Sequence, residues 1–75
     1  MYGLQIESYI KVNEEYIYSS TIFPIVSESK DKLIEYIYKV QKEHNAKEPY
    51  FSERGWILEW EDFRYIATIE DVVII

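Results

Sequence analysis

Hydrophobic and polar residues alternate along the first part of the chain. In LQIESYIKV, residues 4–12, most apolar side chains recur at every second position and polar ones stand between them. Since successive side chains of a strand point to opposite faces, this pattern predicts a strand with one buried face. A turn at Asn13-Glu14 then leads into EYIYSSTIFPI, residues 15–25, whose β-branched and aromatic residues predict a second strand.

The second predicted strand is apolar on both faces. Strict alternation places Tyr16, Tyr18 and Ile22 on one face, and Ile17, Phe23 and Ile25 on the other. A strand with two apolar faces is either central in a sheet or pressed against a partner. Pro24 cannot donate a hydrogen bond to a neighbouring strand, so we expect the pairing to weaken there.

The spacing of apolar residues changes to a helical one over SESKDKLIEYIYKVQKEHNA, residues 27–46. Leu33, Ile37 and Val40 recur at i, i+4 and i+7 and form a single stripe. The residues between them are mostly charged. This segment therefore predicts an amphipathic helix with one apolar stripe and one solvated face.

The rest of the chain predicts a connecting loop and two further strands. Residues 46–55 contain a proline and a glycine and have the composition of a loop. WILEWE, residues 56–61, and RYIATI, residues 64–69, each predict a strand, with an acidic turn between them. VVII, residues 72–75, is a possible fifth strand.

The predicted order of elements is β-β-α-β-β, with a possible fifth C-terminal strand, in a single α+β domain over residues 1–75. We expect an antiparallel sheet with one helix packed on one face. The other face should then be solvated or covered by another molecule. Because the chain has eight tyrosines, three phenylalanines and two tryptophans, some aromatic side chains should lie on that other face.

Composition argues against several classes of function. The chain has no cysteine, which excludes disulfides and thiolate metal sites and fits a cytoplasmic location. Its longest apolar runs are too short to span a bilayer. With one histidine, two glycines and no nucleophile motif, the sequence gives no reason to expect an enzyme, a metal site or a cofactor.

The net charge of −6 is concentrated in the second half of the chain. Residues 43–75 hold eight acidic side chains against three basic ones, a net charge of −5. Such a field disfavours direct binding of nucleic acid or of an anionic membrane, because both depend on lysine and arginine. The acidity either keeps a small apolar domain dispersed in water or forms a face for a basic partner.

The two tryptophans decide which acidic side chains face outward. Trp56 and Trp60 lie on one face of their predicted strand, and burying that face avoids burying the acidic residues of the other face. We therefore expect both tryptophans in the core. The acidic residues that then point outward form a candidate protein-binding patch: Glu59, Glu61, Asp62, Glu70 and Asp71.

Three tyrosines of the first two strands are candidate aromatic contacts of a protein partner: Tyr9, Tyr16 and Tyr18. Together with the acidic patch, they predict a small non-enzymatic protein-binding domain. Its most concrete form is a phage- or mobile-element-encoded inhibitor of a host defence protein or of a basic nucleic-acid-handling protein. The alternative is a homodimeric structural or regulatory protein whose open aromatic sheet face self-associates.

Overall fold

Two residues in the left-handed backbone conformation close the first hairpin. Asn13 and Glu14 have φ angles of 51° and 69°. Positive φ at both central residues is characteristic of the type I′ turn, whose twist matches that of the strands it joins. The strands are β1 (Tyr2–Val12) and β2 (Glu15–Ser27), which pair along their whole length.

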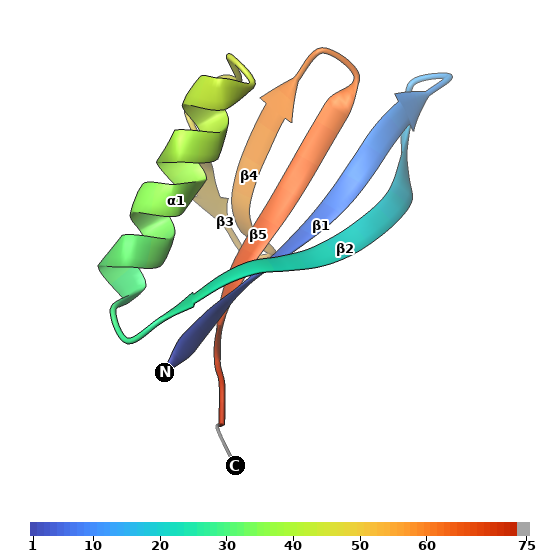
Figure 1. Cartoon of the computed structure of the whole chain (residues 1–75). Coiled ribbons are helices and arrows are strands. Elements are labelled where there is room, and N and C mark those ends of the chain that lie inside the picture. Colours follow the sequence, from blue (N-terminus) through green and yellow to red (C-terminus); the bar gives the residue numbers. More distant parts are fainter. Residues whose placement is uncertain (74–75) are drawn as a thin grey trace.

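The computed structural model describes residues 1–73, in which one helix and five strands are arranged as two layers (Figure 1). The elements after the hairpin are α1 (Lys30–Glu43), β3 (Tyr50–Ser52), β4 (Gly55–Trp60) and β5 (Phe63–Asp71). The strands form one antiparallel sheet in the order β2-β1-β5-β4-β3. The predicted small α+β domain, with an antiparallel sheet and one helix, is confirmed.

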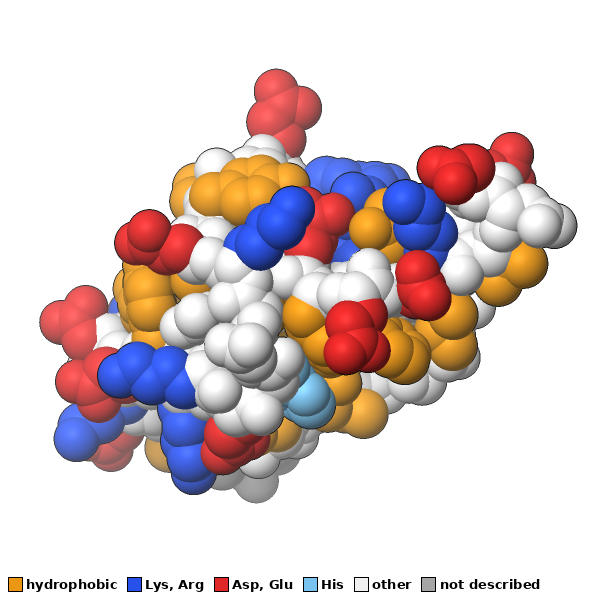
Figure 2. Space-filling view, turned by 90° about the horizontal axis from the view of Figure 1, so that it is seen from above, with side chains coloured by type: hydrophobic (Ala, Val, Ile, Leu, Met, Phe, Trp, Pro, Cys, Tyr) orange, Lys and Arg blue, Asp and Glu red, His pale blue; other side chains and the backbone are white. Residues whose placement is uncertain are grey.

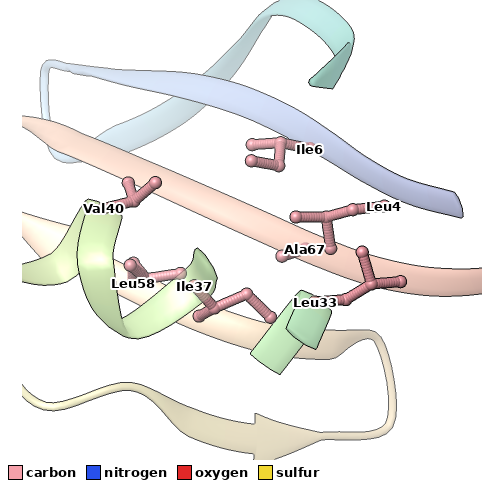
Figure 3. Packing of buried hydrophobic residues seen from close by; sticks show 7 residues of the cluster. All are labelled: Leu4, Ile6, Leu33, Ile37, Val40, Leu58 and Ala67. Carbon is pink, nitrogen blue, oxygen red and sulfur yellow. The ribbon is translucent and has the colours of Figure 1, made fainter. Parts of the chain in front are cut away.

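The core lies between α1 and the middle of the sheet. Leu33, Ile37 and Val40, the predicted stripe of the helix, are all buried. They pack against strand side chains that point to the same side of the sheet (Figure 3), namely Leu4, Ile6, Leu58 and Ala67. A chain of this length has a small core and a marginal free energy of unfolding, so each of these contacts accounts for a large share of it.

Within the described residues, the fifth strand is β3, which precedes β4 in the chain. β3 lies within the segment predicted to be a loop, and it pairs with β4. β5 continues through Glu70 and Asp71, which are paired with the start of β1. Val72 and Val73 lie outside any strand, and the end of the predicted strand, residues 74–75, lies outside the described residues.

Two bulges in β2 change which side chains share a face. The pairing with β1 shifts after Tyr18 and again after Ile22. Each extra residue reverses the alternation of the strand that contains it. Ile22 consequently lies on the helix side of the sheet, with Ile17 and Ile25, and not beside the tyrosines as strict alternation predicted.

Candidate protein-binding surface

The sheet face opposite α1 carries a polar network centred on Glu59 of β4. Its Oε2 accepts hydrogen bonds from Nε and Nη2 of Arg64, at 3.2 and 2.8 Å, and from the Tyr16 hydroxyl at 3.3 Å. Its Oε1 accepts one from the Tyr50 hydroxyl at 3.3 Å. These four residues come from β4, β5, β2 and β3, so the network joins both edges of the sheet.

Arg64 is held from two sides. Its guanidinium carbon lies 3.9 Å from the centroid of the Tyr16 ring, while its nitrogens bind the Glu59 carboxylate. An arginine that is stacked on an aromatic ring and paired with a carboxylate is fixed more firmly than the arginine of an ordinary surface ion pair. The Glu59 side chain is 26 % exposed. Its carboxylate is thus largely engaged within the chain.

The same contacts lower the pKa of the Glu59 carboxyl below its ordinary value. Hydrogen bonding from Arg64 is the main cause, and partial burial opposes it. The pKa of Arg64 is raised in return, chiefly by the hydrogen bonds to Glu59. A carboxyl with a lowered folded pKa stabilises the fold above its unfolded pKa of about 4.3. That contribution is lost as the pH falls through the folded value.

We expect Arg64→Gln to weaken the fold at neutral pH and to make its stability less sensitive to acid. At pH 7 the loss should be about 1 kcal/mol, the scale of a partly exposed charged pair. At low pH, where Glu59 is protonated in both proteins, the difference should shrink. Urea unfolding near pH 7, 4.5 and 3 measures both effects.

The control is Arg54→Gln, which removes an arginine that forms no ion pair within residues 1–73. It should leave the free energy of unfolding nearly unchanged at each pH. If Arg64→Gln lowered this free energy by the same amount at all three pH values, the contribution would not come from the ionised Glu59 carboxylate.

The three candidate tyrosines lie together on the open face of the hairpin. Tyr9 pairs with Tyr18 across the strands, and their rings meet edge to face with centroids 5.8 Å apart. Tyr16 lies two residues along β2 and is stacked on the Arg64 guanidinium. Tyr9 donates a hydrogen bond to Glu7 at 2.9 Å, and this bond is the main cause of the raised pKa of Tyr9. Their binding role stays a prediction.

The five candidate acidic residues do not form one patch. Glu61 and Asp62 form the turn between β4 and β5, whereas Glu70 and Asp71 lie at the other end of β5. Eight or nine strand residues separate the two pairs by roughly 25–30 Å. Glu59 is engaged with Arg64. Figure 2, which looks down on the top of Figure 1, shows acidic side chains interspersed with basic and uncharged ones.

Both tryptophans lie on the helix side of β4, as predicted, and pack against the core. The Trp56 ring meets those of Tyr38 and Phe51 edge to face. Trp60 stacks on His44, with centroids 4.4 Å apart. Glu59, which directly precedes Trp60 in the strand, therefore points to the open face.

The helix side of the hairpin carries an apolar surface that the sequence pattern did not predict. Phe63, Ile10 and Ile17 are neighbours in one row across β5, β1 and β2, and each is 36 % to 52 % exposed. Val12 lies next to this row on the same face, and Ile22 lies on that face beyond the Ser8–Ser20 pair; both are also exposed. These five residues are called the hairpin shelf below.

Element lengths are the signal that could have revealed the hairpin shelf. The 14 residues of α1 span about 21 Å at 1.5 Å per residue. The 13 residues of β2 span about 43 Å at 3.3 Å per residue. One such helix cannot cover such a strand, and Figure 1 shows the turn of the hairpin well separated from α1.

Two open hollows flank the sheet. One of about 570 Å³, between α1 and the β3–β4 hairpin, has mainly apolar walls that include Phe51 and Trp56. The other, of about 620 Å³, is mainly polar and contains the Glu59–Arg64 pair. Within residues 1–73, no group of three or more His, Cys, Asp or Glu side chains is placed to hold a metal ion. In the same residues, no helix has the length and apolar character needed to cross a membrane.

No protein-family model matches the chain, and comparisons with curated proteins and with solved structures give no match. Function is therefore inferred from the chain's own residues.

Proposed function

We propose that this chain is a non-enzymatic protein-binding domain whose contact surface is the open face of the β1–β2 hairpin. The observation that carries the proposal is the Tyr9–Tyr18 ring pair on this face, with Tyr16 two residues further along β2. Tyrosine buries a large apolar area at low entropic cost and keeps a hydroxyl for hydrogen bonding. β2 has no charged side chain between Glu15 and Glu28, so covering it desolvates few charges.

The partner that this surface fits best is a basic protein. α1 carries four lysines against three acidic residues, so the net negative charge of the chain lies on its strands and turns. The turn at Glu61-Asp62 lies at the same end of the sheet as the tyrosines, as does Glu14, whose carboxylate is 3.7 Å from the Lys11 ammonium. An aromatic centre with acidic residues at its rim complements a basic rim on a partner. An inhibitor of a defence or nucleic-acid-handling protein would use it to occupy lysines and arginines that normally hold phosphates.

We expect Tyr18→Ser to weaken capture of the partner at least tenfold, because central aromatic residues dominate the energy of protein interfaces. The matched control is Tyr50→Ser. Tyr50 is 52 % exposed and Tyr18 53 %, but Tyr50 lies on the opposite edge strand. The tagged chain and both variants are used for affinity capture from a nuclease-treated lysate of its own cells, washed at low and at high salt.

We expect to capture a basic protein in stoichiometric amount. High salt should release it, Tyr50→Ser should retain it, and Tyr18→Ser should lose it. A partner retained equally by both variants would place the contact elsewhere on the molecule. Recovery of only the untagged copy of the chain, lost with Tyr18→Ser, would favour the alternative, self-association through the same aromatic face.

A further inference from the structure

The hairpin shelf gives this chain more exposed surface than a domain of its mass needs. A folded monomer of 9.1 kDa exposes about 4,900 Å², whereas this chain exposes 5433 Å². The radius of gyration is 12.6 Å, compared with about 11 Å for an average domain of 75 residues. Figure 1 shows the turn of the hairpin standing apart from α1, so the helix leaves this part of the sheet uncovered.

The shelf is large enough to be the centre of a small interface. Its five side chains, each roughly two-fifths to one-half exposed, present on the order of 400 Å² of apolar surface. A standard interface buries about 800 Å² on each partner, of which somewhat more than half is apolar. The shelf thus supplies the apolar centre of one side of such an interface, and polar side chains at its rim would supply the remainder.

Charge favours a second copy as the molecule that covers the shelf. None of the five shelf residues is ionisable, and Ser8 and Ser20 are the paired residues between Ile17 and Ile22 on the same face. A chain with a net charge of −6 is repelled by its own copy over most of its surface. Glu15, which pairs with Val12 at the end of the hairpin, lies on the same face. A two-fold axis through Ile10, Ile17 and Phe63 leaves the Glu15 carboxylate at the rim of the contact.

The form of β2 favours contact through faces rather than through edges. β2 is an edge strand, but its two bulges and Pro24 interrupt the row of backbone groups that a further strand would need. The shelf side chains, in contrast, lie in a row across three strands. Face-to-face packing of two shelves covers them without any new strand pairing.

We propose that two copies of this chain associate through their hairpin shelves, around a two-fold axis that brings Ile10, Ile17 and Phe63 of each copy together. The proposal goes beyond the protein-binding function above, since it concerns the other face of the same hairpin and a different partner. The tyrosines stay accessible in this dimer, which would display two open faces.

Sedimentation equilibrium of the full chain tests the proposal over about 1 µM to 1 mM, at low and at high NaCl. The average mass should rise from 9.1 kDa toward twice that value with increasing concentration. High salt should strengthen the dimer, because it screens the repulsion between two acidic copies. A dimer that salt weakens would be held by ion pairs and would overturn the proposal.

Neighbouring substitutions on opposite faces locate the contact. Ile17 is 52 % exposed on the shelf side, and Tyr18 is 53 % exposed on the open side. Ile17→Lys should raise the dissociation constant of the dimer at least tenfold, whereas Tyr18→Lys, which adds the same charge, should leave it within about twofold. Ile22→Lys serves as the shelf variant if circular dichroism shows that Ile17→Lys does not fold.

The proposal is overturned if the chain stays at 9.1 kDa up to millimolar concentration. It is also overturned if Tyr18→Lys weakens the dimer as much as the shelf variant does. These outcomes are independent of the partner capture, in which Tyr18 and Tyr50 are compared.

Discussion

Replacing Gly55 with alanine is expected to lower the free energy of unfolding by at least about 3 kcal/mol. Gly55 begins β4 with a φ angle of +125°, which side-chain-bearing residues rarely adopt. A Cβ added there would lie 2.6 Å from the carbonyl oxygen of Ala67 and 2.8 Å from Cγ2 of Thr68. Because the nearest atom belongs to the backbone of β5, rotation of a side chain cannot relieve the overlap.

Gly3→Ala is the matched control for this substitution. A Cβ at Gly3 would lie 2.7 Å from Cγ2 of Val72, the end of a side chain that follows the last strand, and Gly3 has no positive φ angle. The Val72 side chain can move, so the loss should stay below about 1 kcal/mol. In thermal unfolding, Gly55→Ala should lower Tm by at least about 12 °C. An equal loss of unfolding free energy in both variants would show that the backbone conformation of Gly55 is not the cause of the loss.

The short length of β3 explains why this strand was not predicted from the sequence. Three residues, Tyr50–Ser52, are too few to show alternation, and a proline precedes them. The strand exists because a turn folds it back on β4: the Ser52 hydroxyl donates to the Gly55 carbonyl at 2.9 Å and accepts from the Arg54 N–H at 3.2 Å. The longer elements were predictable because their periodicity extends over many residues.

The Glu59–Arg64 pair could have been predicted from the sequence. A two-residue turn at Glu61-Asp62 places Trp60 opposite Phe63, and therefore the next pair outward, Glu59 and Arg64, opposite each other. Opposite charges in such cross-strand positions attract. In the prediction above, the five acidic residues instead form one outward-facing group, although Glu59 has Arg64 as its partner.

The first bulge of β2 lies beyond what the sequence can predict, whereas the second one occurs at Phe23-Pro24, where the proline predicted weaker pairing. No residue type at Ser19 requires an extra residue in the pairing, yet the shift there moves the following side chains to the other face. The assignment of Ile22 therefore failed, and with it the recognition that the isoleucines of β2 gather on one side. Where a side chain points in a long twisted strand depends on pairing that local pattern does not determine.

Leu58→Ala is expected to lower the free energy of unfolding by about 3–4 kcal/mol, as large-to-small substitutions in a tight core do. Leu58 is 1 % exposed and belongs to the cluster beneath α1. The remaining side chains cannot close the cavity easily, because β4 is held by β3 on one side and by β5 on the other. For a domain of this length, that loss approaches the whole free energy of unfolding.

Because Leu58 lies between Trp56 and Trp60, two spectroscopic signals can follow the unfolding of this variant. Urea unfolding followed by tryptophan fluorescence reports on the core, and far-ultraviolet circular dichroism reports on the sheet and helix. The two transitions should coincide and move together to lower urea, because the domain unfolds as one unit. Ile17→Ala, measured near 1 µM, removes a similar side chain from an exposed position and should cost less than about 1 kcal/mol. If only the fluorescence transition moved to lower urea, the core around Leu58 would loosen while the sheet stayed folded. The open face, which carries Glu59, the next residue of β4, would then survive a loosened core.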